Sequence, residues 1–469
     1  MVRLRQFVSG MRWYEVSEYL LILLTAIAVP IYWRIGLWCF ILLSANTIVK
    51  IFATRHIGNP TIPRPAKTCL FLMMLYFIIY AVSISYSNNP TEAFSTIQTM
   101  LPMLICPIIF LSSDMSYIKT KHLRLITFLL AATLTIRFFF VLPRHGILSL
   151  SDNFTRQFYI FVLSCIARGS HLLFNDTIFE PVVDGLTTSA LYASSHSFPK
   201  NHNLLLDPLH HNYLSLYILT AIALLYTDLT HHWKLSNYHR TRWFVIADII
   251  LLSVYIILIK SRSGLVALSI LSVICLLHLG WWKKKKKIAY IVIACTIAVA
   301  GATYLVAPKM YKHVTSTAKN LVREGEGDVR QKLWRCGLYT FKERPILGYG
   351  CDGYWIALNE NYHKYDCPSG FQGKLSTHNQ YLETAMSVGL IGLVVMLCMM
   401  VAPAILSFRR PRRNLSMLLF TIVYAICIFF EATFERQMGL LFIPWWYCLL
   451  LVRPLPPPAS ETVAMNNPI

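Results

Sequence analysis

Apolar runs of about 20 residues, separated by short polar segments, occupy most of this chain. A helix needs about 20 apolar residues to cross the hydrocarbon core of a bilayer. The pattern therefore predicts an all-α polytopic membrane protein with about twelve transmembrane helices. The predicted spans are residues 18–33, 35–53, 67–87, 95–112, 122–143, 207–226, 242–260, 262–282, 288–307, 379–406, 414–431 and 438–453.

The composition supports a membrane protein and argues against a soluble one. Hydrophobic residues make up 56% of the 469 residues, and charged residues only 14%, whereas a soluble domain has about 25%. The formal net charge of +21 comes from 43 Lys and Arg against 22 Asp and Glu. These basic residues lie between the apolar runs and form no separate basic domain. They are interpreted as topology signals and contacts with inner-membrane lipids, with no nucleic-acid partner.

The basic segments also predict the orientation of the spans. Cytoplasmic loops are enriched in Lys and Arg, which places the run Lys283 to Lys287 and the cluster Arg409 to Arg413 in the cytoplasm. With an even number of spans, both termini are then cytoplasmic. Two long segments, 144–206 and 309–378, face the opposite side. The predicted organisation is nine helices over 1–308 with an outer loop near 144–206, a large outer loop over 309–378, and helices ten to twelve with a cytoplasmic tail over 379–469.

Three of the 12 cysteines, Cys336, Cys351 and Cys367, lie in the second long loop. A disulfide between Cys351 and Cys367 is one interpretation in an oxidising compartment. Free thiols are equally consistent with three cysteines that show no metal-ligand spacing. Both interpretations stay open at the level of sequence.

One hairpin breaks an otherwise continuous apolar stretch at Lys260-Ser261-Arg262-Ser263-Gly264. The predicted topology puts Arg262 at the outer membrane interface, where one helix ends and the next begins. An arginine here can be a snorkelling residue that anchors the hairpin. It can also bind a phosphate, because a planar guanidinium beside serines and a helix N-terminus suits an anion.

The loop 309–378 and the helix that follows carry two further motifs. In GDVRQKLWRCGLYTFKERPILGYGCDGYW, residues Arg330, Trp334 and Phe341 are at helical spacing, and a proline and a glycine-rich turn follow. In STHNQYLETAMSVGLIGLV, His378 and Asn379 immediately precede a membrane helix. A histidine in that position is more often a cap or an interfacial residue than a catalyst.

Together, SRSG at the hairpin, R-x-x-x-W followed by PILGYGCDGY in the outer loop, and HNQYLE at the start of the next helix resemble the O-antigen ligase family. That family also includes O-antigen polymerases and bacterial protein O-oligosaccharyltransferases. The resemblance implies a metal-independent, inverting membrane glycosyltransferase of the GT-C type without cofactors. Its donor is a glycan on undecaprenyl pyrophosphate, and its active site faces the periplasm. The first outer loop, YWRIG, has no carboxylate for a metal ion, which agrees with this expectation.

The resemblance assigns roles to three residues: His378 as general base, and Arg262 and Arg330 as ligands of the donor pyrophosphate. A leaving pyrophosphate gathers negative charge that arginines can meet, and the acceptor hydroxyl needs a base that works near neutral pH. Glu431 and Arg436, near the outer end of the last hairpin, can be a structural pair or a functional one. Further candidates for the site are Lys260, Arg335, His211, Tyr213, Asn379 and Tyr381, with no metal ligand among them.

The leading functional hypothesis is an O-antigen ligase of the bacterial inner membrane. It would join polysaccharide from undecaprenyl pyrophosphate to a lipid A-core acceptor in lipopolysaccharide biosynthesis. An O-antigen polymerase or a protein O-oligosaccharyltransferase would use the same donor and remains an alternative. A flippase or transporter is the alternative from a different class, but it would be expected to carry ionisable residues near the bilayer midplane or inverted repeats.

Overall fold

The computed structural model describes residues 12–60, 62–115, 117–118, 120–141, 210–232, 241–259, 261–282, 329–365, 376–409 and 411–452. Over these ranges the secondary structure is helical and contains no strand. Eight of the helices there are long and apolar enough to cross a membrane, and two shorter apolar helices cover 414–430 and 437–452. The prediction of an all-helical polytopic membrane protein is confirmed. The predicted span 288–307, the loop 144–206 and residues 309–328 lie outside the described residues.

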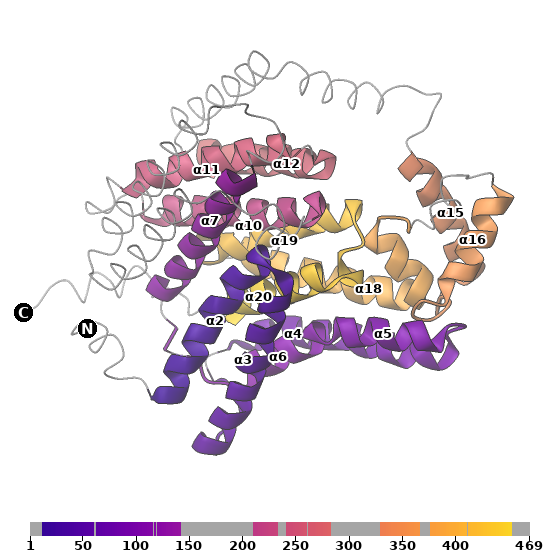
Figure 1. The fold of residues 1–469 in the computed structure, drawn as a ribbon, viewed down its shortest axis with the longest axis horizontal. Coiled ribbons are helices and arrows are strands. Elements are labelled where there is room, and N and C mark those ends of the chain that lie inside the picture. The colour runs from indigo at the N-terminus through magenta and orange to yellow at the C-terminus, as the bar shows by residue number, and fades with distance from the viewer. Residues whose placement is uncertain are drawn as a thin grey trace, which may run out of the picture. The chain divides into compact units, whose positions relative to one another are not determined.

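The chain divides into two compact units, one of residues 1–46 and 126–310 and the other of 47–125 and 311–469. In the first unit, α10 packs against both α11 and α12, which also contact each other (Figure 1). Within the most apolar part of α10, 89% of the residues are buried, so protein rather than lipid surrounds this span. The helices of this unit are α2 (Trp13–Ile31), the start of α3 (Trp33–Thr54), most of α7 (Thr120–Val141), α10 (His211–His232), α11 (Thr241–Leu258) and α12 (Arg262–Leu277).

In the second unit, the long helix α18 packs along both α19 and α4, and α20 packs against α6 and α19. The predicted span 95–112 begins earlier, at Pro90, and is divided at Leu101 because Pro102 starts a new helix. Proline suits the first position of a helix, where its missing N–H is not needed. The helices are α4 (Arg64–Ser83), α5 (Pro90–Met100), α6 (Pro102–Ser112), α15 (Val329–Glu343), α16 (Tyr354–Lys364), α18 (Gln380–Arg409), α19 (Pro411–Phe430) and α20 (Gln437–Val452).

Helices α15 and α16 form a pair that packs on the start of α18 (Figure 1). The helical spacing from Arg330 to Phe341 is confirmed as α15, which ends at Glu343, two residues before Pro345. Leu333, Tyr354 and Leu358 are buried between the two helices, and Met386 of α18 joins the same cluster. An apolar cluster shared by three helices thus fixes α15 and α16 against the start of α18.

The glycine-rich turn after α15 docks into a kink in α18. Val388 and Gly389 leave the helical conformation, and Gly389 has φ 64° and ψ −161°. The kink frees two carbonyl oxygens of α18, so Met386 accepts a hydrogen bond from the Tyr349 N–H (2.9 Å) and Ser387 accepts one from the Gly350 N–H (2.8 Å). The backbone of the PILGYG motif therefore hydrogen-bonds to the part of α18 where the helix is interrupted.

Candidate functional site

The predicted general base, His378, lies on a tight turn immediately before α18. Asn379 caps the helix, since its side-chain oxygen accepts hydrogen bonds from the N–H groups of Tyr381 (2.9 Å) and Leu382 (3.2 Å). His378 has a positive φ of 49°, a conformation that is uncommon outside glycine and that the surroundings must hold in place. The turn therefore fixes the orientation of the His378 side chain relative to the backbone.

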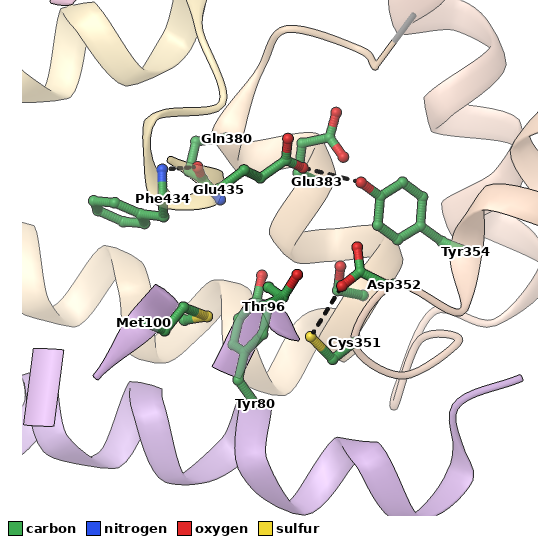
Figure 2. A pocket seen from close by; sticks show the side chains of 11 residues that line it. Tyr80, Thr96, Met100, Cys351, Asp352, Tyr354, Gln380, Glu383, Phe434 and Glu435 are labelled. Atoms are coloured by element: carbon green, nitrogen blue, oxygen red, sulfur yellow. Dashed lines mark hydrogen bonds between the residues drawn. The ribbon is translucent and has the colours of Figure 1, made fainter. Parts of the chain in front are cut away.

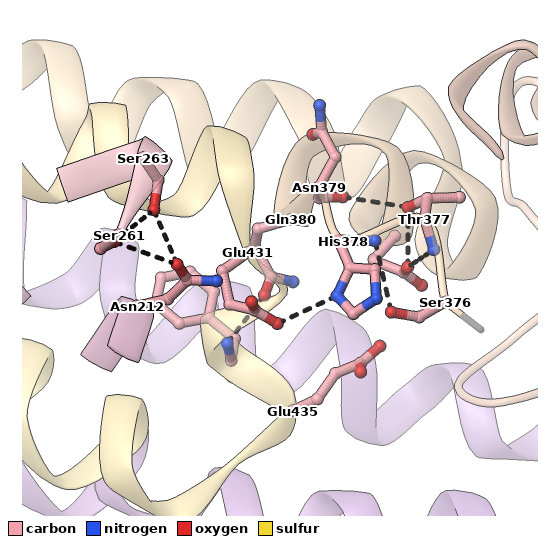
Figure 3. A network of polar contacts seen from close by, with 12 residues as sticks. Asn212, Ser261, Ser263, Ser376, Thr377, His378, Asn379, Gln380, Glu431 and Glu435 are labelled. Carbon is pink, nitrogen blue, oxygen red and sulfur yellow. Dashed lines mark hydrogen bonds and ion pairs between the residues drawn. The ribbon is translucent and has the colours of Figure 1, made fainter. Parts of the chain in front are cut away.

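His378 faces a glutamate from the segment after α19 (Figure 3). Its Nδ1 lies 3.2 Å from Oε1 of Glu431, and the exposed fractions of the two side chains are 31% and 9%. In the neutral imidazole, donation from Nδ1–H to this carboxylate leaves Nε2 as the unprotonated nitrogen, which can accept a proton. The buried carboxylate therefore orients a ring that stays accessible, which is the arrangement a general base needs.

Two residues in the first turn of α18 hold the two halves of this pair. Oε1 of Glu383 accepts hydrogen bonds from both the N–H (2.8 Å) and the hydroxyl (2.7 Å) of Thr377, the residue before His378. The side-chain oxygen of Gln380 accepts a hydrogen bond from the Phe434 N–H (2.7 Å), in the segment that follows Glu431. One short stretch of helix thus anchors the segment that carries the imidazole and the segment that carries the carboxylate.

Helix α15 contacts the same turn through the R-x-x-x-W motif. The indole N–H of Trp334 donates to the carbonyl oxygen of Thr377 (2.9 Å). Gly337 permits this approach, because a Cβ there would lie 2.8 Å from the Thr377 methyl group. Arg330 is partly buried and lies one helical turn before Trp334, on the same face of α15. The structure therefore links the helix that carries Arg330 to the turn that carries His378.

Glu383, which binds Thr377 of this turn, also lines a small acidic pocket (Figure 2). Asp352, Glu383 and Glu435 line it together with Tyr354, whose hydroxyl donates to Oε1 of Glu435 (3.0 Å). Burial, with the nearby carboxylate of Glu383 as a further cause, raises the pKa of Glu435 well above its ordinary value. Two carboxyl groups in one low-dielectric pocket favour keeping a proton, because two negative charges there would repel each other.

The raised pKa of Glu435 predicts that stability depends on pH. The folded protein keeps a proton that the unfolded chain releases above about pH 4.3, so stability falls as the pH rises from there toward the raised pKa. Glu435→Gln imitates the protonated carboxyl group and should flatten this fall, by at most about 1.4 kcal/mol per pH unit. Thermal unfolding of the purified protein in detergent from pH 5 to pH 8 measures it. Glu360→Gln, an exposed carboxyl group on α16, is the control, and equal slopes in wild type and Glu435→Gln would contradict the prediction.

In the first unit, the SRSG motif forms the start of α12 (Figure 3). The Ser261 hydroxyl caps the helix by accepting the Gly264 N–H (3.1 Å), and the Ser263 hydroxyl donates to the side chain of Asn212 on α10 (2.7 Å). A Cβ at Gly264 would lie 2.5 Å from the Ser215 hydroxyl, so glycine allows α10 and α12 to meet closely. Arg262 is the first residue of α12, at a helix end that favours anions.

The other candidate site residues differ in their hydrogen bonds and in their exposure to solvent. Asn379 is used as a helix cap, and the Tyr381 hydroxyl donates to the Ala425 carbonyl of α19 (3.0 Å). Arg335 contacts Tyr339 through its Nε (3.2 Å). In the first unit, His211 is exposed at the start of α10, and Tyr213 is buried. Lys260 and Cys367 lie outside the described residues.

The sequence did not predict that three carboxyl groups belong to the candidate site. Glu431 appeared only as a possible partner of Arg436, although it contacts His378, and neither Glu383 nor Glu435 was considered. One signal was present: Glu383 stands in the HNQYLE motif, and a glutamate in the first turn of an apolar helix has to be neutralised or hydrogen-bonded. No local pattern marks Glu435.

The spans define a polytopic membrane protein, and its second unit holds a histidine–carboxylate pair beside the first residue of α18. Residues 248–397 match the family model described as O-antigen ligase, so the resemblance to that family is confirmed over this range. The family consists of membrane enzymes of the glycosyltransferase type and covers O-antigen ligases, polymerases and O-oligosaccharyltransferases. The matched range includes Arg262, Arg330 and His378.

A curated relative is an uncharacterized protein of Haemophilus influenzae (strain ATCC 51907 / DSM 11121 / KW20 / Rd). It is 27% identical over 196 residues, which are 40% of this chain and 48% of that protein. The chain therefore spans about half the length of this relative.

Proposed function

We propose that this protein is an O-antigen ligase of the bacterial inner membrane. It transfers polysaccharide from undecaprenyl pyrophosphate to a lipid A-core acceptor on the periplasmic side. In this proposal the chain has twelve spans in a GT-C-type arrangement, cytoplasmic termini, and a large periplasmic loop that includes α15 and α16. The match of residues 248–397 to the O-antigen ligase family supports the substrate class, a lipid-linked glycan.

The observation that carries the proposal is the His378–Glu431 pair. Nε2 of His378 takes the proton from the acceptor hydroxyl as its oxygen attacks the anomeric carbon. The new glycosidic bond forms on the face opposite the pyrophosphate, so the configuration inverts. The old bond breaks, and its electron pair goes to a pyrophosphate oxygen. Glu431 supports the imidazolium that forms, because a carboxylate stabilises the positive charge beside it.

The two arginines meet the charge that develops on the leaving group. Arg330 extends from α15, which Trp334 ties to the His378 turn. Arg262 stands at the N-terminus of α12, where the helix dipole adds to the attraction for an anion. A guanidinium is suited to this task, since its planar fork can donate to two phosphate oxygens at once.

Deletion of the gene in the host bacterium tests the proposal through its lipopolysaccharide, resolved on a gel. The expected result is bare lipid A-core together with polymerised glycan retained on undecaprenyl pyrophosphate. Complementation with the wild-type gene should restore the ladder of long chains. Core with a single repeat unit would instead identify a polymerase. An unchanged ladder would exclude both roles and direct attention to glycoproteins or to lipid-linked glycan transport.

A further inference from the structure

The turn between α15 and the glycine-rich motif exposes two large apolar side chains. Ile346 is 66% exposed and Leu347 is 55% exposed. They follow Pro345 within a segment that is otherwise polar, flanked by Lys342, Glu343 and Arg344. Exposing two adjacent aliphatic side chains to water is unfavourable. Their depth relative to the bilayer therefore decides whether they contact water or lipid.

The first measure of the depth of this turn comes from α18. It ends at Arg409, on the cytoplasmic side in the predicted topology, and a hydrocarbon core takes about 20 helical residues. Counting back about 20 residues from Phe408 reaches Gly389, the site of the kink. The next residue, Leu390, donates its N–H to the carbonyl oxygen of Pro345 (2.8 Å). The turn therefore lies at the outer edge of the hydrocarbon core.

Helix α4 gives a second and independent measure. It begins at Arg64, on the cytoplasmic side in the predicted topology, and about 20 residues further the chain reaches Ser83. The Ser83 hydroxyl accepts the Cys351 N–H (2.9 Å), and just beyond it the Tyr86 hydroxyl donates to the carbonyl oxygen of Leu347 (2.9 Å). The two antiparallel spans thus place the turn at the same depth.

The exposed side chains also continue an apolar surface of α18. Beyond the kink, Leu390, Ile391 and Val394 are 51%, 45% and 47% exposed, as expected for the lipid-facing side of a span. Before the kink, the helix instead buries polar residues such as Glu383 and Ser387. The change from protein-enclosed to lipid-facing helix therefore occurs at the point where residues 345–347 touch α18.

We infer that the Pro345–Leu347 turn inserts into the outer surface of the bilayer and that Ile346 and Leu347 contact phospholipid acyl chains. The turn would anchor α15 at the membrane surface. If the proposed function holds, this anchoring fixes the position of α15, the helix that carries Arg330, relative to the bilayer. The inference itself rests on burial and depth alone and does not need that function.

Photocrosslinking to lipid tests the inference without an activity assay. Benzoylphenylalanine is introduced at position 346, and separately at 347, in the full chain. Each variant is reconstituted into vesicles of phosphatidylethanolamine and phosphatidylglycerol and irradiated, and adducts are measured by intact-protein mass spectrometry. Position 394 on α18 is the lipid-facing control and position 360, an exposed site on α16, is the water-facing one. We expect phospholipid adducts at 346 and 347 at more than half the yield at 394, and at least fivefold above 360.

Two results would overturn the inference. One is an adduct yield at 346 and 347 that equals the yield at 360. The other is crosslinking that appears only after undecaprenyl pyrophosphate is added to the vesicles, which would assign the surface to the donor chain. A thermal transition equal to that of the wild type establishes that each variant is folded. Having two exposed positions in the same turn keeps the test valid if one substitution disturbs the fold. A failed deletion phenotype with positive crosslinking would reject the proposed function and leave the membrane insertion standing.

Discussion

Replacing His378 by alanine is expected to lower glycan transfer by about 10²- to 10⁴-fold, the range that a positioned general base contributes. The protein should still insert and fold, because the His378 side chain is 31% exposed and the surrounding turn is held by Thr377 and Asn379. Initial transfer rates on purified lipid-linked donor and acceptor, with equal amounts of folded enzyme, give the measurement.

Matched variants separate catalysis from structure at this position. His363→Ala removes an exposed histidine of α16 and should leave transfer unchanged. Glu431→Gln keeps the shape of the partner side chain but removes its charge, so it should lower transfer by less than His378→Ala does. Wild-type transfer by His378→Ala would end the assignment of this residue as the base. A loss of transfer in His363→Ala as well would show that the assay reports something other than the His378 turn.

Replacing Gly389 by alanine is expected to destabilise the fold by about 2 to 6 kcal/mol, as the sum of backbone strain and overpacking. Gly389 has φ 64° and ψ −161°, a conformation that is essentially confined to glycine. A Cβ there would lie 2.1 Å from the carbonyl oxygen of Ile346. Because the obstacle is backbone, no side-chain rotation can relieve the clash. The folded yield in size-exclusion chromatography and the thermal transition in detergent measure the effect.

Gly280→Ala is the matched control for this prediction. Gly280 also lies in a helical segment near the end of a span, but a Cβ there would have no atom within 4 Å. Its transition should stay close to that of the wild type. A Gly389→Ala protein as stable as Gly280→Ala would mean that the glycine-rich turn does not dock into the kink of α18.

The features that sequence predicted correctly are those set by neighbouring residues. Apolar runs predicted most spans because hydrogen bonds in lipid must close within the segment, which leaves the helix as the available structure. The spacing of Arg330, Trp334 and Phe341 predicted α15, since residues three and four apart lie on one face. Asn379 before an apolar run marked the start of α18, and the structure uses it as the cap.

Some contacts of the site residues and of α18 could not be predicted from the sequence. The sequence offered Asn379 and Tyr381 as candidate site residues from their place beside His378, and the structure shows their side chains bonded to the α18 backbone and to the α19 carbonyl of Ala425. The kink at Gly389 was also missed, because a 28-residue apolar run reads as one continuous helix. The backbone that bonds to the kink comes from the turn at Pro345, more than 40 residues earlier.

The sequence by itself determined the helical membrane class, most spans, helix α15 and the segments that carry Arg262, Arg330 and His378, because periodicity, length and caps act within a few residues. Only the tertiary structure decided that Glu431 faces His378 across 53 positions and that Glu383 and Gln380 hold the two sides of that pair. It also decided that Asp352, Glu383 and Glu435 share one pocket. These contacts depend on how separate helices pack, and packing brings together carboxyl groups whose local sequence gives no sign that they will meet.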